Sequence, residues 1–371
     1  MNTYKICNYC VMDNESDPSI SFDENGQCNY CRQALSEINT TTYFPGEDGK
    51  EKLEKLIKEI KEAGKNNEYD CMMGISGGLD SSYLAYLGHK WGLRVLAVHI
   101  DDDFDTDISK ENIRKLIEKT GFKMVVLKPD FEQYADLTKA YMKAGVPNLA
   151  IPQDNILFAE IYKEAKKRKI KYFLSGGNFA LECILQKGNT YTAYDVKNIK
   201  DIHKKFGKKP IDKLTFLTTA KKGFYNVTKT IASVRPLNYI EYNREKAFKE
   251  LSDFCGFEYY GSKHLENVLT AFIQLYWLPK KFNVDKRKSH LSSMIVSGQM
   301  TRNEALAELQ KPLIDSSLMN KYIEEVKTKL DISDEEFAEI MSNKTHQHDE
   351  YKTEKFVKII SRFRHRKDIK K

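Results

Sequence analysis

The feature of this sequence that most constrains its fold is residues 74–82, which read Gly-Ile-Ser-Gly-Gly-Leu-Asp-Ser-Ser. The short run 69–73 before it predicts a buried strand, and residues 82–91 after it predict a helix. A strand, a glycine turn and a helix in this order direct backbone N–H groups toward an anion. Because Gly77 and Gly78 let the chain turn tightly and let phosphate oxygens approach the backbone, the stretch predicts a phosphate-binding loop.

The side chains of this loop suit a nucleotide. Ser76 and Ser81 supply hydroxyl donors, and Asp80 can hold Mg²⁺ or orient a nucleophile. The loop is not the P-loop of kinases and GTPases, because no Gly-Lys-Ser/Thr follows it. The alternative interpretation is an ordinary turn between a strand and a helix.

Strands and helices alternate over residues 68–181, which predicts a parallel sheet with helices on both faces. The predicted strand at 94–100 ends in three acids, Asp101-Asp102-Asp103. The predicted strand at 170–174 ends in a second glycine turn, Ser175-Gly176-Gly177-Asn178.

Ligands bind at the carboxyl ends of the strands in open α/β sheets. We therefore expect His99, Asp101 and Gly176 to contact the nucleotide, with both glycine turns in one crevice. The three acids could equally cap the next helix.

The chain has 371 residues, and 41% of them are hydrophobic, enough for two or three domains. We expect a four-cysteine zinc-knuckle module at 1–45, a nucleotide-binding domain at 46–240, and a mainly helical C-terminal region with a basic tail at 241–371. No apolar run approaches the ~18 residues of a membrane span, and residues 1–10 hold no apolar signal-peptide core. These patterns predict a cytoplasmic protein that does not enter a membrane.

The net charge of +7 is unevenly distributed. Residues 187–229 carry +8 and residues 344–371 carry +6. Basic stretches suit a phosphate-bearing ligand or a nucleic acid, but they are also typical of a solvated surface. Aromatic residues lie among the lysines of 187–229, which is compatible with stacking on RNA, with a flap over a nucleotide sugar, or with a second core.

Four of the seven cysteines form two Cys-x-x-Cys knuckles, Cys7/Cys10 and Cys28/Cys31, which are seventeen residues apart. Two such pairs provide the four thiolates that structural Zn²⁺ favours in a tetrahedral site. An iron–sulfur cluster is the rival ligand. Because a closed four-cysteine site has no open position for catalysis, we expect this metal to serve folding and docking.

The loop resembles the SGGxDS signature of the PP-loop ATP pyrophosphatases. Those enzymes cleave ATP between its α- and β-phosphates and adenylate an oxygen of the substrate. Further segments resemble one family among them, the N-acetyl sugar amidotransferases, and the resemblance runs from about Cys7 to Leu309. Besides the knuckles, these segments are 175–178, 235–239 (Arg-Pro-Leu-Asn-Tyr), 263–267 (Lys-His-Leu-Glu-Asn), 278–287, 289–293 and 297–301.

This resemblance implies an enzyme that converts an N-acetyl group of a bacterial surface sugar to an acetamidino group. ATP would adenylate the amide oxygen, ammonia would then displace AMP, and Mg²⁺ would assist. The implied catalytic residues are Asp80, His264 and Glu266. The implied nucleotide-binding residues are Ser76, Gly77, Gly78, Asp80, Ser81, His99, Asp101 and Gly176. The implied substrate-binding residues are Asn178, Lys263, Asn267, Lys286, Arg287 and His290.

Two other classes compete with this interpretation. A tRNA-modifying PP-loop enzyme, a thiolase or a lysidine-type ligase, would explain the knuckles and the basic stretch equally well. Of the remaining cysteines, Cys71, Cys183 and Cys255, we consider Cys183 alone a plausible sulfur carrier, and burial in a core is typical of all three. A non-enzymatic zinc adaptor would not need a pyrophosphate loop. We expect the sugar-modifying enzyme rather than the tRNA-modifying one, and we therefore do not expect a nucleic-acid partner.

The source of nitrogen is the last expectation. A glutaminase needs an activated cysteine nucleophile, and none of the three remaining cysteines lies in a Gly-x-Cys-x-Gly context. We therefore expect a separate glutaminase subunit that supplies ammonia.

Overall fold

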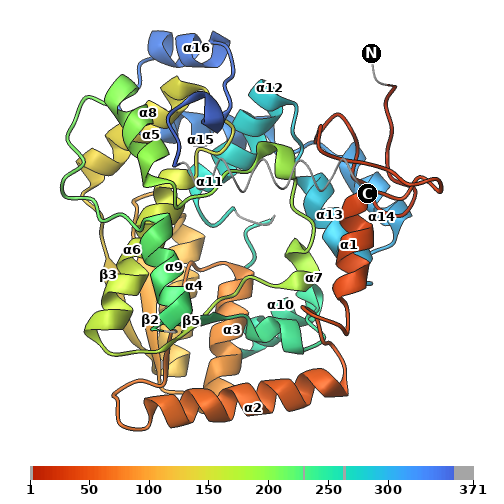
Figure 1. Ribbon diagram of the computed structural model, residues 1–371, viewed down its shortest axis with the longest axis vertical. Coiled ribbons are helices and arrows are strands. Elements are labelled where there is room, and N and C mark those ends of the chain that lie inside the picture. Colours follow the sequence, from red (N-terminus) through yellow and green to blue (C-terminus); the bar gives the residue numbers. More distant parts are fainter. Residues whose placement is uncertain (1–2, 229, 262–264, 355–371) are drawn as a thin grey trace.

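The computed structural model covers residues 1–371, and the structure describes residues 3–228, 230–261 and 265–354. Its centre is a sheet of five strands in the order β3-β2-β1-β4-β5 (Figure 1). All neighbouring strands are parallel. The predicted α/β class is therefore confirmed. The strands are β1 (Cys71–Gly74), β2 (Val95–Ile100), β3 (Lys123–Leu127), β4 (Tyr172–Leu174) and β5 (Ala232–Val234).

Helices before and between the strands cover both faces of this sheet. They are α2 (Glu47–Gly64), α3 (Leu79–Lys90), α4 (Asp107–Thr120), α5 (Phe131–Ala144), α6 (Ile151–Lys167), α7 (Phe179–Glu182), α8 (Val196–Phe206) and α9 (Thr219–Thr228), with short 3₁₀ turns η1 (Lys187–Asn189) and η2 (Pro236–Tyr239). The helix predicted at 82–91 begins earlier, at Leu79, because Gly78 already has the extended backbone of an N-cap.

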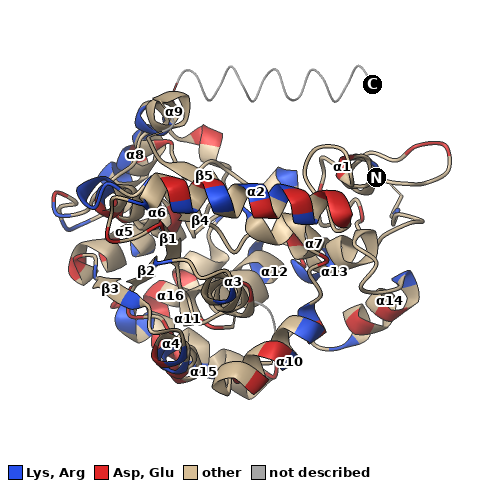
Figure 2. Cartoon of the chain, turned by 90° about the horizontal axis from the view of Figure 1, so that it is seen from below, with Lys and Arg blue, Asp and Glu red and all other residues tan. Residues whose placement is uncertain are grey.

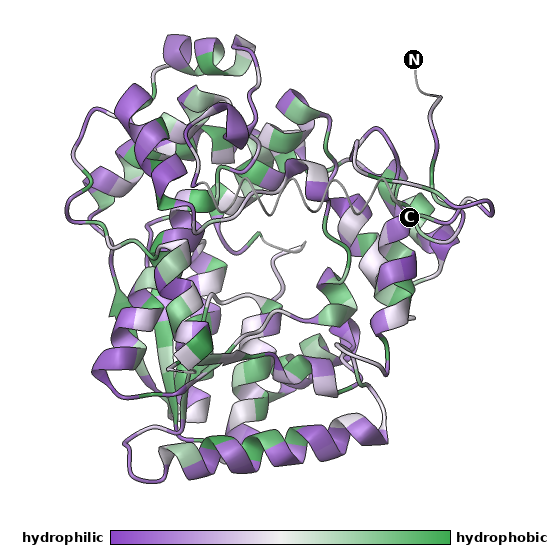
Figure 3. Cartoon of the chain, viewed as in Figure 1, coloured by the Kyte–Doolittle hydropathy of each residue, from purple (hydrophilic) through white to green (hydrophobic). Residues whose placement is uncertain are grey.

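Side chains of the strands alternate between two cores, as the period of two in a strand requires. On β1, Met73 packs in the core that includes α3 and α4, whereas Met72 packs in the core that includes α6 and α9. Figure 3 shows the hydrophobic strands inside and the more hydrophilic α2 outside. On α2, acidic and basic residues alternate along the outer surface (Figure 2).

The N-terminal region packs on the rest of the protein. It contains α1 (Asn29–Glu37), which contacts a C-terminal helix, α13 (Arg287–Val296) (Figure 1). The four knuckle cysteines belong to the same buried core as Met73. The aromatic ring of Tyr43 stacks on that of Phe179 in α7, with ring centroids 4.9 Å apart.

The C-terminal region is helical, as predicted. It comprises α10 (Arg244–Cys255), α11 (Val268–Phe272), the π-helix η3 (Ile273–Trp277), α12 (Leu278–Phe282), α13, α14 (Arg302–Gln310), α15 (Ser316–Lys329), α16 (Asp334–Ser342) and the 3₁₀ turn η4 (His348–Glu350). Thr301 and Ser333 are the N-caps of α14 and α16, and the side chain of each accepts a hydrogen bond from the backbone N–H three residues later. In the described part of the chain, no helix is both long and apolar enough to cross a membrane.

The basic stretch 187–229 contributes to a second core. Ile199 and Ile202 of α8, which packs against α5, are fully buried in this second core. Several of its lysines pair with acids: Lys209 with Glu132, Lys213 with Asp130 at 2.8 Å, and Lys205 with Asp201 at 3.1 Å. Of the three interpretations of its aromatic residues, the second core is the one that the packing supports. The basic tail lies outside the described residues beyond position 354.

Candidate active site

The glycine-rich loop is compact and is held by its own serines. The hydroxyls of Ser76 and Ser81 are 3.1 Å apart, and the N–H of Gly78 donates to the Ser76 hydroxyl at 3.2 Å. Gly77 has φ +75°, and a Cβ there would lie 2.4 Å from the carbonyl oxygen of Ser109. Only glycine fits this position without a shift of the backbone.

The two glycine turns meet, as the sequence predicted. A Cβ on Gly176 would lie 3.0 Å from the backbone nitrogen of Ser81, at the first turn of α3. Gly78, the N-cap of α3, has no side chain to occupy the helix N-terminus. The N–H groups of this turn and the positive end of the helix dipole therefore favour an anion here.

The first cavity lies over the loop and has a volume of about 200 Å³. The Tyr242 hydroxyl donates a hydrogen bond to Asp80 Oδ1. Burial, together with the Asp80 charge, raises the pKa of Tyr242 well above its usual value. The lining residues are Ser76, Gly78, Leu79, Asp80, Ser81, Gly176, Gly177, Leu181, Glu182, Arg244, Tyr259, Tyr260 and Glu266.

A second cavity of about 290 Å³ adjoins the first and shares Ser76, Gly176 and Glu266 with it. It lies at the carboxyl ends of β1, β2 and β4, where ligands bind in open α/β sheets. Its walls are mostly apolar and include Ile75, Val98 and Phe158. A flat apolar base fits such a cavity while its phosphates reach the loop.

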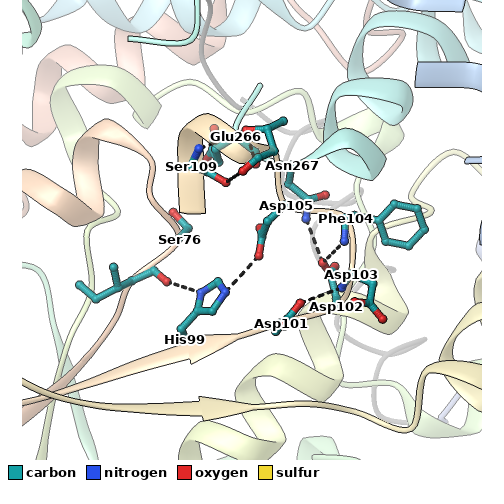
Figure 4. Close-up of polar contacts among 12 residues, drawn as sticks. Ser76, His99, Asp101, Asp102, Asp103, Phe104, Asp105, Ser109, Glu266 and Asn267 are labelled. Carbon is teal, nitrogen blue, oxygen red and sulfur yellow. Dashed lines mark hydrogen bonds and ion pairs between the residues drawn. The ribbon is translucent and has the colours of Figure 1, made fainter. Parts of the chain in front are cut away.

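His99 lies at the end of β2 in this second cavity (Figure 4). Its Nδ1 is 2.9 Å from the carbonyl oxygen of Ile75, and its Nε2 is 3.0 Å from Asp105 Oδ2. Burial alone would lower the pKa of His99, but the hydrogen bond and charge of Asp105 outweigh it and the pKa is raised. With an acceptor at each nitrogen, the doubly protonated ring is the form that satisfies both contacts.

Asp102 is the buried centre of a polar network next to His99 (Figure 4). Its carboxylate accepts hydrogen bonds from Gln153 at 2.6 Å, from the Asn267 amide at 3.0 Å and from the Tyr134 hydroxyl at 3.2 Å. Burial and the nearby charge of Asp105 raise the pKa of Asp102. Asn267, predicted to bind substrate, is therefore engaged in this network, and it also caps α11.

Asp101 was predicted to contact the nucleotide, but its side chain does not line either of the two cavities. It pairs with Lys128 at 2.6 Å. Burial would raise its pKa, but the hydrogen bond from Lys128 lowers it. The alternative, that the three acids cap the next helix, is wrong, because Thr106 is the N-cap of α4.

Glu266, one of the implied catalytic residues, lines both cavities, and its catalytic role stays a prediction. A Cβ on Gly78 would lie 2.8 Å from Glu266 Oε1, so this carboxylate directly adjoins the loop. Its backbone carbonyl accepts a hydrogen bond from Thr106 N at 3.0 Å, which ties the segment to the N-terminus of α4. The predicted residues Lys263 and His264 lie outside the described residues.

The other predicted substrate residues divide into two groups. Asn178 is buried and caps α7, and Arg287 pairs with Asp285 at 2.8 Å. These two side chains hold the fold. Lys286 and His290 line a third cavity, and Arg287 is also part of its wall.

Several lining residues were missed from the sequence. Glu182, Arg244, Tyr259 and Tyr260 come from segments without a motif, so no local pattern pointed to them. Asp154 lines the second cavity, and burial raises its pKa to about 6. The polar run Gln153-Asp154-Asn155 at the start of α6 was a usable signal for this acid.

The four knuckle cysteines form a separate buried cluster. Their sulfur atoms all lie within 4.8 Å of one another. Backbone N–H groups point at these sulfurs, including Cys28 N to Cys7 Sγ at 3.2 Å and Cys31 N to Cys28 Sγ at 3.4 Å. Four close, buried sulfurs that accept N–H hydrogen bonds fit a tetrahedral metal site.

Residues 266–364 match a family described as LPS biosynthesis protein WbpG-like, C-terminal domain. No curated protein is similar enough in sequence to match the chain.

The solved structures that are similar to this chain include the following three. NMN synthetase from Francisella tularensis has 16% identity over 72% of this chain and 98% of that chain, with a TM-score of 0.35. NH3-dependent NAD synthetase from Campylobacter jejuni has 15% identity over 72% and 98%, with a TM-score of 0.35. U34-tRNA thiolase NcsA from Methanococcus maripaludis has 14% identity over 84% and 90%, with a TM-score of 0.33.

The matched segment begins at Glu266, at the wall of the two cavities, and the loop that faces it carries the Ser-Gly-Gly-x-Asp-Ser signature on a parallel sheet. The chain therefore joins an α/β domain that carries the Ser-Gly-Gly-x-Asp-Ser signature to a C-terminal segment that matches the WbpG-like C-terminal domain.

Proposed function

We propose that this protein is an ATP-dependent N-acetyl sugar amidotransferase in the synthesis of a bacterial surface polysaccharide. It converts the N-acetyl group of a sugar to an acetamidino group and releases AMP and pyrophosphate. The observation that carries the proposal is the position of Glu266. This first residue of the WbpG-like match adjoins Gly78 in the phosphate loop, so a sugar site in that region would meet the phosphates of ATP.

The loop and the two cavities divide the work of binding ATP. The apolar second cavity holds the base, and the N-terminus of α3 with Ser76 and Ser81 holds the phosphates. Asp80 and Glu266 are the carboxylates at the loop that suit Mg²⁺, which would neutralise charge on the leaving pyrophosphate. Holding the sugar and ATP in adjoining cavities makes the reaction effectively unimolecular.

The chemistry follows from the poor leaving ability of an amide oxygen. That oxygen attacks the α-phosphorus of ATP, the bond to the β-phosphate breaks, and pyrophosphate leaves. Ammonia then adds to the carbon atom of the adenylated amide and loses a proton. AMP leaves and carries the former amide oxygen with it. The product is an amidine in which NH has replaced O.

Nitrogen would come from a separate glutaminase subunit. Burial raises the pKa of Cys71, of Cys255 and, to about 12, of Cys183. A glutaminase nucleophile needs the opposite, an activated thiol. The remaining cysteines form the buried cluster, to which we assign structural Zn²⁺.

A tRNA-modifying enzyme is the weaker candidate. Cys183, the expected sulfur carrier, has a raised pKa, and its segment is fixed because Ile184 N donates to the Ser293 hydroxyl at 3.0 Å. Three lysines of the stretch that suggested RNA, Lys205, Lys209 and Lys213, are paired with acids of α8 or of the N-terminal end of α5. These observations favour the sugar.

The test is to incubate the purified chain with ATP, an ammonium salt at alkaline pH and a panel of N-acetylated sugar nucleotides and nonulosonic acids. Mass spectrometry should show that the mass of one sugar decreases by the difference between O and NH. Glutamine without a second protein should not replace ammonium. Efficient turnover with glutamine alone would contradict the assignment of a separate glutaminase.

A further inference from the structure

A third cavity, of about 220 Å³, lies beside the loop cavity and shares Leu181 and Arg244 with it. Its walls come from α7, α10, the π-helix η3, α13 and α14. ATP does not need this third cavity, because the proposed function assigns its phosphates to the loop cavity and its base to the second cavity. The lining residues are Leu181, Arg244, Gly261, Gln274, Leu275, Lys286, Arg287, His290, Leu291, Met294, Met300 and Glu308.

Lys286, the residue before α13, brings an unpaired positive charge to this cavity. Among the described residues its ammonium has no hydrogen-bond or ion-pair partner, although it is largely withdrawn from solvent. Burial lowers its pKa, which the more distant charges of Asp17 and Glu182 oppose. Lys288, two residues further on, pairs with Asp13 and donates to Ser16 at 2.9 Å. Of these two neighbouring lysines, Lys288 is therefore neutralised by an acid, whereas within the described residues Lys286 is not.

Arg244 brings a second positive charge, at the boundary between the two cavities. Its guanidinium lies 5.0 Å from the centre of the Tyr259 ring and also contacts the Tyr259 hydroxyl. In the part of the chain that the structure describes, it has no carboxylate partner. A ring face orients a guanidinium without neutralising it, so the charge stays available to an anion.

The rest of the wall adds donors and apolar surface but little competing charge. The Gln274 side chain has no hydrogen-bond partner within the described residues, and it lies on a π-helix, a distortion that is frequent at functional sites. The carboxylate of Glu308 pairs with Lys311 at 2.6 Å, and Arg287 is neutralised by Asp285. Leu275, Leu291 and two methionines give the cavity an apolar wall, and such a wall strengthens an ion pair formed beside it.

We propose that this third cavity binds an anionic group, a phosphate or a carboxylate, of the acceptor sugar through Lys286 and Arg244. The inference rests on the proposed function, because it assumes that the sugar's acetamido group lies at the phosphate loop. Arg244 lines both cavities, so one acceptor can extend from the loop into the third cavity. The substrate class is therefore an N-acetyl sugar that carries its own negative charge.

Isothermal titration of the full-length protein, with its bound metal, tests this directly. The probes are neutral N-acetylglucosamine, N-acetylglucosamine 1-phosphate and N-acetylneuraminic acid, each with and without α,β-methylene-ATP. At least one anionic probe should bind about tenfold or more tightly than the neutral sugar, as a charge-assisted contact predicts. Comparing the phosphate with the carboxylate identifies which anion the cavity takes. Equal binding of all three, or no binding of either anionic probe, would overturn the inference.

Matched variants locate the effect. Lys286→Met should remove the preference for the anionic probe, Lys286→Arg should restore most of it, and Lys280→Met, at an exposed lysine on α12, should leave it unchanged. An unchanged preference in Lys286→Met would overturn the inference. Binding of α,β-methylene-ATP is measured alongside. If the wild type did not bind α,β-methylene-ATP, the proposed function would be contradicted. The sugar titrations without nucleotide would still test whether the third cavity binds an anion. Thermal unfolding of each variant shows that it is folded.

Discussion

The Nε2 atom of His99 lies 3.0 Å from Oδ2 of Asp105, and both side chains are buried in the cavity next to the phosphate loop. The opposite ring nitrogen faces the carbonyl oxygen of Ile75 at 2.9 Å, the last residue before the loop's first serine. The pair therefore links the end of β2 to the beginning of the loop. Its charge state should influence how firmly the loop is held.

The first prediction concerns the pH dependence of stability. The pKa of His99 is raised in the folded protein, so its contribution is fully present below the unfolded pKa, near 6.5, and is lost as pH rises through the folded pKa. Asp105→Asn should remove this contribution. The difference in unfolding free energy between wild type and variant should therefore be largest near about pH 6 and smaller near about pH 9. Urea unfolding at both values measures it, and a difference that grows with pH would contradict the ion pair.

The second prediction concerns Asp80. Asp80→Ala should reduce pyrophosphate release by about a hundredfold or more while the protein stays folded. Tyr242→Phe removes the hydroxyl that donates to Asp80 and should lower the rate less. Tyr83→Phe is the matched control, because its hydroxyl contacts Glu250 at 3.1 Å outside the cavities. Equal losses in the two tyrosine variants would mean that the contact with Asp80 has no special role.

The third prediction uses the close approach of the two glycine turns. A Cβ at Gly176 would come 3.0 Å from Ser81 N, so Gly176→Ala should disturb the loop and weaken ATP binding. At Gly223, on the exposed side of α9, a Cβ would meet no atom within 4 Å. Gly223→Ala should leave ATP binding unchanged and stabilise the helix by roughly 0.5–1 kcal/mol. Nucleotide titration and thermal unfolding of both variants separate the two effects.

The fourth prediction is one zinc ion per chain at the four knuckle cysteines. Cys28→Ser should lose the metal and lower the unfolding temperature by at least about 5 °C, because metal binding contributes folding free energy. Elemental analysis measures the metal directly, and stoichiometric iron would contradict zinc.

Loss of zinc should also weaken sugar binding, because the knuckles contact α13 and α14. Val11 N donates to the Ser292 hydroxyl at 3.2 Å, and the Arg302 guanidinium donates to the Cys7 carbonyl at 2.9 Å. In the Cys28→Ser variant, KM for the acceptor should therefore rise more than KM for ATP. Equal changes in both would indicate a general loss of structure.

The fifth prediction separates amidine formation from sulfur transfer. Cys183→Ser should retain most of the activity, because the thiol has a raised pKa and takes no part in the proposed chemistry. Complete loss of activity in a folded variant would favour a thiolation enzyme.

The sequence was sufficient to locate those features of the candidate site that depend on a few neighbouring residues. The loop at residues 74–82, the turn at Gly176 and the cysteine pairs are each defined by a few neighbouring residues. The placement of the two glycine turns follows from the carboxyl-end rule for parallel sheets. Side-chain direction within the acidic run was not predictable. Asp103 has φ +64°, and Asp101 pairs with Lys128 while Asp102 and Asp105 face the second cavity.

The third cavity shows a different limit of the sequence. Lys286 and Arg287 are adjacent, yet one charge is unpaired and the other is neutralised by Asp285. The fate of each charge depends on which helices pack beside it, and Arg244 reaches the cavity from another helix. No local pattern encodes these tertiary neighbours.

The central claim, that ATP activates the amide oxygen of the sugar, is tested most directly by isotope transfer. The acceptor identified in the sugar panel is labelled with oxygen-18 in its acetyl carbonyl and turned over with ATP and ammonium. The account predicts that the label appears in AMP, with one labelled atom for each amidine formed, and that pyrophosphate stays unlabelled. Unlabelled AMP, or formation of ADP and phosphate, would contradict it.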